Sequence, residues 1–161
     1  DKDGSNATIN DSEVFIGVGA RGYSSNPIST FIGTENYGIF KSTDTGTNWN
    51  RVVLNHPTAN KGPEAPNDFE IGSDNTLWLS TTRNVYGGDG GRVYSSTNGS
   101  TFTLKHKVPN GKRTEIAVSK TSANKIYILA QLATTASPVG VYLTTDGFAT
   151  TPTTLAKQHV L

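Results

Sequence analysis

The stretch Gly38-Ile39-Phe40-Lys41-Ser42-Thr43-Asp44-Thr45-Gly46-Thr47-Asn48-Trp49 decides the fold, because the chain repeats its pattern twice more. The second copy runs from Gly91 to Phe102 and reads GRVYSSTNGSTF, and the third runs from Gly140 to Phe148 and reads GVYLTTDGF. In each copy a short strand with an aromatic residue leads into a turn rich in Ser, Thr, Asp, Asn and Gly. Self-similarity at intervals of about fifty residues is typical of propellers and solenoids.

Strands are predicted on both sides of each repeated turn. Short runs of Val, Ile, Tyr, Phe and Thr are separated by Gly, Pro and Asn, and no segment has the period of an amphipathic helix. Three strands are expected in the first repeat and four in each of the others. Their ranges are 14–18, 39–42 and 49–54; then 68–72, 77–81, 92–96 and 102–108; then 114–119, 125–131, 141–145 and 151–155.

Four antiparallel strands in up-and-down order make one blade of a β-propeller. The sequence therefore predicts an all-β fold, a partial β-propeller of about three blades in a single domain over 1–161. Blade 1 is incomplete and covers 13–54, blade 2 covers 67–108, and blade 3 covers 113–157. We expect the inner strands to be covered on both faces. Known propellers have about four to eight blades, so we expect the chain to be part of a longer protein or of a larger assembly.

Composition limits the classes of partner. The 161 residues carry a formal charge of +1 without a basic run, which argues against a nucleic-acid partner. No apolar stretch approaches the roughly 18 residues of a membrane-spanning helix. The chain contains no cysteine, which excludes disulfides, thiolate metal sites and thiol catalysis.

The repeated turn carries a family resemblance. The pattern Ser-x-Asp-x-Gly-x-x-Trp resembles the Asp box, or bacterial neuraminidase repeat, of exported bacterial sialidase-like and xyloglucanase-like propellers. The first copy matches fully, with Asn48 where the family usually has Thr, and the other copies match in part. The matching residues are Ser42, Asp44, Gly46 and Trp49; Ser95, Gly99, Thr101 and Phe102; and Thr144, Asp146 and Gly147.

Asp44 is interpreted as a structural residue of the turn rather than as a catalytic acid. A short carboxylate accepts hydrogen bonds from backbone N–H groups just ahead of it. Gly46 is suited to positive φ, and Trp49 can cover the hairpin. The resemblance implies that these turns lie between the third and fourth strands, opposite the usual ligand-binding end.

Loops at the other end are the candidates for ligand binding. Up-and-down strand order brings five loops to this end, and functional residues concentrate on such loops. The loops are 21–36, 55–67, 83–91, 109–113 and 132–137. The loop 83–91 combines a cation, an amide, an aromatic ring and a carboxylate, which suits a sugar, although a flexible polar loop is the alternative. The candidate ligand-binding residues are Arg83, Asn84, Tyr86 and Asp89, with a weaker pair in Arg21 and Tyr23.

Candidate catalytic residues are Asp68 and Asp89, because glycoside hydrolysis uses paired carboxyl groups. Asp68 and Glu70 would share one face of a strand. A complete sialidase site is not expected, since no Arg-Ile-Pro motif precedes the first blade and a cluster of three arginines is not evident. The segment 1–6 has the acidic spacing of a calcium loop but no glutamate at the position that would close it. The scattered histidines show no metal-ligand spacing, so neither a metal nor another cofactor is expected.

Two functional hypotheses remain open at this stage. The first is a non-catalytic interaction module of an exported or cell-surface bacterial protein, which binds glycan or protein partners through its loops. The alternative is a part of a glycoside hydrolase, xyloglucanase-like or sialidase-like, whose cleft is completed by further blades.

Overall fold

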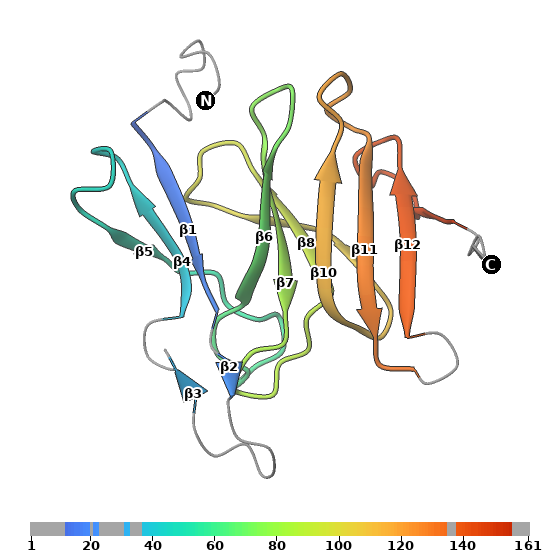
Figure 1. The fold of residues 1–161 in the computed structure, drawn as a ribbon, viewed down its shortest axis with the longest axis horizontal. Helices are drawn as coiled ribbons and strands as arrows, with labels where there is room; N and C mark the ends of the chain where they lie inside the picture. Colours follow the sequence, from blue (N-terminus) through green and yellow to red (C-terminus); the bar gives the residue numbers. More distant parts are fainter. Residues whose placement is uncertain (1–11, 20, 23–30, 33–36, 135–137, 156–161) are drawn as a thin grey trace, which may run out of the picture.

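The computed structural model describes residues 12–19, 21–22, 31–32, 37–134 and 138–155. Over these residues the protein is all-β and contains no helix, as the sequence predicts (Figure 1). The strands form three successive groups along the chain. We call them the first group (β1, β4 and β5), the middle group (β6 to β9) and the last group (β10 to β13).

The middle group is a four-stranded antiparallel meander. Its strands are β6 (Ala65–Ile71), β7 (Leu77–Thr82), β8 (Arg92–Ser96) and β9 (Thr103–Lys107), and each pairs with the next. All four fall where the sequence predicts them, within a few residues. β6 begins earlier than predicted, because its pairing with β7 continues past a register shift to Ala65.

The last group repeats this arrangement. Its strands are β10 (Gly111–Val118), β11 (Ile126–Leu132), β12 (Val139–Thr144) and β13 (Thr153–Thr154), again paired in order. β13 is shorter than the predicted strand because Pro152 precedes it and cannot donate a ladder hydrogen bond. A single residue pair, Arg113 with Thr82, joins the middle and last groups into one sheet.

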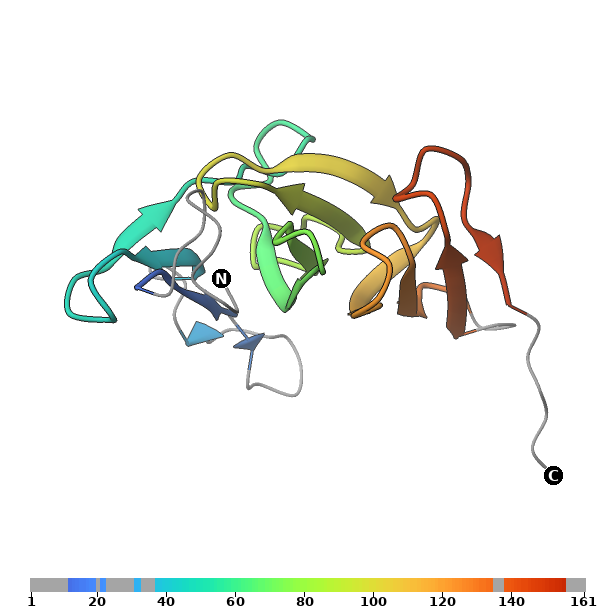
Figure 2. The same ribbon diagram turned by 90° about the horizontal axis from the view of Figure 1, so that it is seen from above.

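The first group has three antiparallel strands, β1 (Val14–Val18), β4 (Gly38–Ser42) and β5 (Asn50–Val52). Between β1 and β4 lies a short hairpin of β2 (Arg21–Gly22) and β3 (Phe31–Ile32). Turned by 90°, the groups fan out in an arc (Figure 2). The all-β architecture of antiparallel meanders in an arc fits a partial propeller.

Apolar side chains fill the two seams between neighbouring groups. The seam between the first and middle groups is built around Ile39, Leu79 and Tyr94. The larger seam, between the middle and last groups, contains buried residues from both. These are Trp78, Val93, Val108, Ile116, Val118, Ile126, Ile128 and Ala130. The core therefore lies between sheets packed face to face, and every group contributes strand residues to it.

Coverage of both faces of the inner strands was predicted, and this is correct only for the middle group. In β7 five consecutive residues are buried, because sheets lie on both sides. In β11 buried and exposed residues alternate, and in β1 Val14 and Ile16 are exposed. The first and last groups each therefore have one sheet face exposed, whereas both faces of the middle group are covered.

The three repeated turns are closed by the same hydrogen bonds. In the first turn the Ser42 hydroxyl donates to Asp44 Oδ1 at 2.7 Å and accepts the Gly46 N–H at 2.8 Å. The Asp44 carboxylate accepts the Asn48 N–H at 2.8 Å. These bonds hold the pKa of Asp44 at about 2, chiefly through the Asn48 backbone. Thr144 and Asp146 repeat this arrangement in the third turn.

In the second turn the alignment from sequence is one residue out. Ser96, not Ser95, supplies the hydroxyl, which donates to Asn98 Oδ1 and accepts the Gly99 N–H at 2.9 Å. Asn98 takes the position of the aspartate, and its oxygen accepts the Ser100 and Thr101 N–H groups. The strand register agrees, because Ser42, Ser96 and Thr144 each pair with the first residue of a second strand.

Candidate functional site

A hollow of about 240 Å³ lies at the loop end of the molecule, opposite the repeated turns. Two of the predicted ligand-binding residues, Arg83 and Asp89, line it. The remaining lining residues come from two neighbouring loops and are Asn110, Gly111, Lys112 and Ala133. Three of the loops predicted to share this end thus meet here, those at 83–91, 109–113 and 132–137.

Close backbone contact holds the loop 83–91 against the start of β10. A Cβ built on Gly91 would lie 2.7 Å from the Gly111 Cα, and one built on Gly90 would lie 2.1 Å from the Lys112 carbonyl oxygen. Gly91 also adopts a φ of 83°, which a side chain resists. The glycines therefore allow the backbone of the loop 83–91 to touch the backbone at the start of β10.

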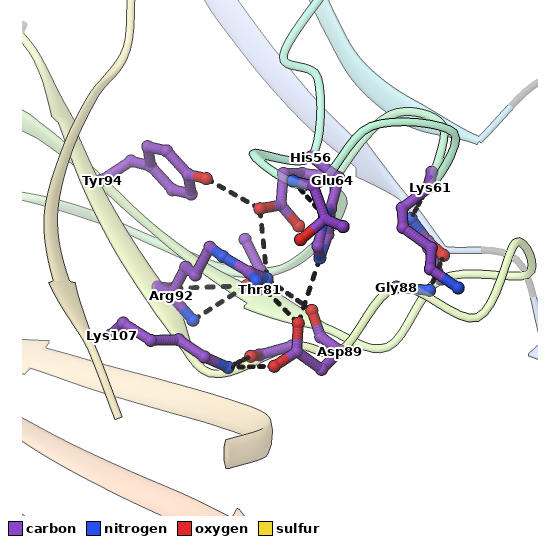
Figure 3. Close-up of polar contacts among 12 residues, drawn as sticks. His56, Lys61, Glu64, Thr81, Gly88, Asp89, Arg92, Tyr94 and Lys107 are labelled. Atoms are coloured by element: carbon purple, nitrogen blue, oxygen red, sulfur yellow. Dashed lines mark hydrogen bonds and ion pairs between the residues drawn. The ribbon is translucent and has the colours of Figure 1, made fainter. Parts of the chain in front are cut away.

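Asp89 is held by three cationic or donor side chains (Figure 3). Its Oδ1 lies 2.6 Å from Arg92 Nη2 and 3.1 Å from His56 Nε2, and its Oδ2 lies 2.7 Å from Lys107 Nζ. About half of the Asp89 side chain (55%) is nevertheless exposed. The carboxylate is thus fixed from the protein side while its remaining surface faces the hollow.

Hydrogen bonding settles the tautomer of His56. Its Nδ1 accepts the Thr58 N–H at 3.0 Å, so the proton lies on Nε2 and is donated to Asp89. Burial alone would raise the pKa of Asp89, but the hydrogen bonds from Lys107, Arg92 and His56 outweigh it and lower that pKa. Asp89 is therefore a carboxylate of low basicity, suited to accepting hydrogen bonds rather than to donating a proton.

A buried carboxyl group lies beneath Asp89. Glu64 is 1% exposed; its Oε1 accepts the Tyr94 hydroxyl at 2.7 Å and lies 3.4 Å from Arg92 Nη1. Burial raises the pKa of Glu64, and Tyr94 and Arg92 only partly offset this. Glu64 Oε2 is buried without a hydrogen-bond partner. Arg92 thus bridges Glu64 and Asp89 and anchors the hollow to the core.

Asn84 has no hydrogen-bonding capacity left for a ligand. Its Nδ2 donates to the carbonyl oxygens of Lys61 and Pro63, at 2.5 and 2.8 Å. Its Oδ1 accepts the N–H groups of Tyr86 and Gly88. The prediction that Asn84 binds a ligand is therefore replaced by a structural role, because this buried amide ties the loop 83–91 to the segment before β6.

The aromatic ring of the predicted set does not line the hollow. Tyr86 lies over Gly62, where a built Cβ would come within 2.3 Å of its ring, and it faces the Tyr37 ring at 6.3 Å between centroids. About half of its surface (52%) is exposed. The backbone of Arg21 pairs with Ile32, and Tyr23 lies outside the described residues.

Asp68 lies at the seam between the middle and last groups. Its Oδ2 accepts the backbone N–H of Ile116 at 3.0 Å, from β6 to β10. Glu70, two residues on, lies 3.5 Å from Lys120 Nζ. Neither Asp68 nor Glu70 lines the loop-end hollow, whereas Asp89 does. The structure therefore does not combine Asp68 and Asp89 into a carboxyl pair around that hollow.

Sequence reasoning named the loops that meet at this hollow but not several of the residues that line or support it. Asn110 and Lys112 lie in a predicted loop yet carry no motif, and Asn110 adopts a φ of 56°. His56, Glu64 and Lys107 come from distant segments and show no spacing signal. Among the described residues no group of three or more His, Cys, Asp or Glu could hold a metal ion. Nor does the described part of the chain contain a helix long and apolar enough to cross a membrane.

Comparison with known proteins supports the fold. No protein-family model matches the sequence, and no curated protein matches it. Among solved structures, the chain is similar to the GH74 enzyme of Niastella koreensis, a β-propeller glycoside hydrolase, with a TM-score of 0.55 and 22% identity. The likeness covers 94% of this chain and 21% of the enzyme. At this identity the likeness bears on the fold, which is propeller-like, and the chain spans about a fifth of the enzyme.

Proposed function

We propose that the chain is a segment of an Asp-box β-propeller, about three blades of it, that binds glycans through the loop-end hollow without catalysing their cleavage. The hollow that Arg83, Asp89, Asn110 and Lys112 share carries this proposal. It supplies cations for an acidic group, and a carboxylate and an amide for hydroxyl groups. Such convergent polar groups in a concave site are what orient a small ligand.

The support beneath Asp89 favours binding over catalysis. Arg92 holds Asp89 from three residues away, while His56 and Lys107 come from elements far apart in sequence, so the carboxylate is fixed before a ligand arrives. Preorganisation of this kind reduces the entropy cost of binding. A general acid of a glycosidase requires a raised pKa, whereas the pKa of Asp89 is lowered. Glu64 has a raised pKa but is buried and does not line the hollow.

The Asp-box assignment rests on the shared closure of the three turns by a hydroxyl and a carboxylate or amide. An Asp-box propeller segment implies an exported or cell-surface bacterial protein. Its other partners would be further blades of its own chain or a surface assembly. We propose this location and these partners with the function.

Calorimetric titration with sialyllactose and with xyloglucan oligosaccharides tests the binding function. Arg83→Ala and Lys112→Ala should each weaken binding about tenfold or more, the equivalent of one charge-assisted hydrogen bond. Lys120→Ala is the matched control, because it removes the same charge from the turn between β10 and β11 at the other end. If neither probe binds, or if all three variants lose binding equally, the proposal is refuted.

A part of a glycoside hydrolase is the second candidate, and the likeness to a GH74 enzyme favours it. In that case Asp68 or Asp89 would contribute to a cleft completed by other blades. Incubation with xyloglucan and sialosides distinguishes the two functions. Hydrolysis that is lost in Asp68→Ala or Asp89→Ala, while the folded structure is retained, would replace the binding proposal with this one.

A further inference from the structure

Two cations in the loop-end hollow have no partner among the described residues. They are Arg83 and Lys112, which line the hollow from two neighbouring loops, and we call them the free cations. The other arginines whose side chains the structure describes are Arg51, Arg92 and Arg113. Each of those three donates to a carbonyl or carboxylate oxygen. The hollow therefore contains two positive charges that no described side chain neutralises.

Asp89, the carboxylate that lines the hollow, does not compensate the free cations. It is already held by Arg92 Nη2 at 2.6 Å, by Lys107 Nζ at 2.7 Å and by His56 Nε2 at 3.1 Å (Figure 3). It forms no ion pair with Arg83, although both residues line the same hollow. The positive charges in and beneath the hollow thus outnumber the negative ones, and their field favours an anionic ligand.

The backbone that carries each free cation is held in place. Beside Arg83, the buried amide of Asn84 ties its loop to the segment before β6. Beside Lys112, the Gly111 N–H donates to the Val108 carbonyl oxygen at 3.0 Å. A bound anion would therefore order the two long side chains but not the loops, which keeps the entropy cost of binding low.

The described residues that line the hollow include no aromatic ring. Tyr86, from the same loop as Arg83, lies over Gly62 instead. Most small-molecule sites combine apolar or aromatic walls with a few polar groups. Here the apolar C–H face of a sugar finds no ring on which to pack, so charge must supply most of the affinity.

We infer that the loop-end hollow selects a glycan unit that carries an anionic group, either a carboxylate or a sulfate ester. This inference rests on the proposed function, in which the same hollow binds glycans. Arg83 and Lys112 bind the anionic group through charge-assisted hydrogen bonds, and the guanidinium fork matches two oxygens of one group. Asp89 and Asn110 accept or donate hydrogen bonds to hydroxyl groups of the same sugar. A neutral glycan leaves the free cations without a partner and is bound more weakly.

Calorimetric titration with pairs of probes that differ in charge tests this inference. Two pairs vary a carboxylate: trigalacturonate with its methyl ester, and sialyllactose with its methyl ester. The third pair is sulfated N-acetylglucosamine with N-acetylglucosamine. The anionic member of at least one pair should bind about tenfold more tightly or better than its neutral partner. This preference should shrink when the salt concentration is raised from about 0.05 to about 0.3 M.

Variants that remove one charge show whether the free cations cause the preference. Arg83→Gln and Lys112→Gln should each weaken binding of the anionic probe about tenfold more than binding of its neutral partner. Lys120→Gln is the matched control and should keep the wild-type preference, because Lys120 is exposed and does not line the hollow. Thermal unfolding of each variant verifies that it is folded.

The outcomes separate this inference from the function on which it rests. Equal affinity for both members of every pair overturns the inference and leaves glycan binding in place. A preference that persists in both variants also overturns it, because the anion would then be bound elsewhere. So does displacement of the anionic probe by sodium acetate or sodium sulfate at the same concentration, since the site would then bind free anions. If no probe binds, the inference and the proposed function both fail.

Discussion

Replacement of Tyr94 by Phe tests whether the buried hydrogen bond between Tyr94 and Glu64, beneath the loop-end hollow, is formed as described. The change removes only the hydroxyl that donates to Glu64 Oε1 at 2.7 Å. Because the ring is buried and Phe fills nearly the same volume, no large cavity results. Glu64 keeps Arg92 at 3.4 Å but loses its shortest hydrogen bond.

The expected loss in the free energy of unfolding is about 2 kcal/mol at pH 8. A hydrogen bond to a charged group contributes about 1.5–3 kcal/mol, and its removal leaves a carboxylate in a poorly solvated site. At pH 4 the expected loss is smaller, about 1 kcal/mol, which is typical of a neutral hydrogen bond.

The direction of this pH dependence follows from the pKa of Glu64. Burial raises that pKa in the folded state, so stability from this group is fully present below the unfolded pKa and is lost as the pH rises through the folded one. Tyr94 lowers the pKa of Glu64 and so limits the loss. Without the hydroxyl the pKa rises further, and the difference between variant and wild type must grow with pH.

Urea denaturation followed by Trp fluorescence at pH 4 and pH 8 measures both losses. Tyr86→Phe is the control. Because Tyr86 is half exposed, loss of its hydroxyl should leave the free energy of unfolding nearly unchanged. In a Glu64→Gln background, the stability loss caused by Tyr94→Phe should no longer depend on pH. The single and double variants together should show a coupling energy between positions 64 and 94. A loss under about 0.5 kcal/mol at pH 8, or a loss that shrinks as the pH rises, refutes the reasoning.

Three further predictions concern the first repeated turn, the glycine contact and the larger seam. Asp44→Asn should fold normally, as Asn98 does in the second turn, but its melting temperature should fall less than that of wild type between pH 5 and pH 2. The reason is that the pKa of Asp44 is lowered to about 2, so the carboxylate stabilises the fold above its unfolded pKa, and this contribution is lost as the pH falls; an unchanged acid profile contradicts this. Gly91→Ala should cost about 2–4 kcal/mol in urea denaturation, because the new Cβ meets Gly111 and φ is positive. Gly19→Ala, where nothing lies within 4 Å of the added Cβ, is its control, and equal costs would be inconsistent with the close approach. Ile128→Ala should cost about 2–5 kcal/mol by opening a cavity in the larger seam, and calorimetric unfolding with a loss near zero would disprove that packing.

The strands and turns could be predicted because their signals are local. Runs such as Val14–Val18 and Arg92–Ser96 are bounded by glycines and polar turns, and the structure reproduces both ranges. The one-residue error at Ser95 and Ser96 has a simple cause. Two adjacent serines precede the turn, and only strand register distinguishes which hydroxyl points into it.

The site could not be predicted in the same way, because its contacts join distant segments. Asp89 could be chosen from the loop 83–91, but its partner His56 lies 33 residues away, and Tyr94 lies 30 residues from Glu64. Asn84 looked like a ligand-binding amide because sequence does not show that Lys61 and Pro63 carbonyls occupy it. Polar residues in a loop are candidates for both roles, and only their partners in space separate the two.

An amide-resolved NMR titration of the chain with sialyllactose and with xyloglucan oligosaccharides tests the central claim most directly. If the loop-end hollow binds glycans, the shifted signals will cluster at Arg83, Asp89, Asn110 and Lys112 for at least one probe, and those of the turn at 42–49 will stay in place. Shifts confined to other surfaces, or no shifts with either probe, would contradict the assignment of function to this hollow.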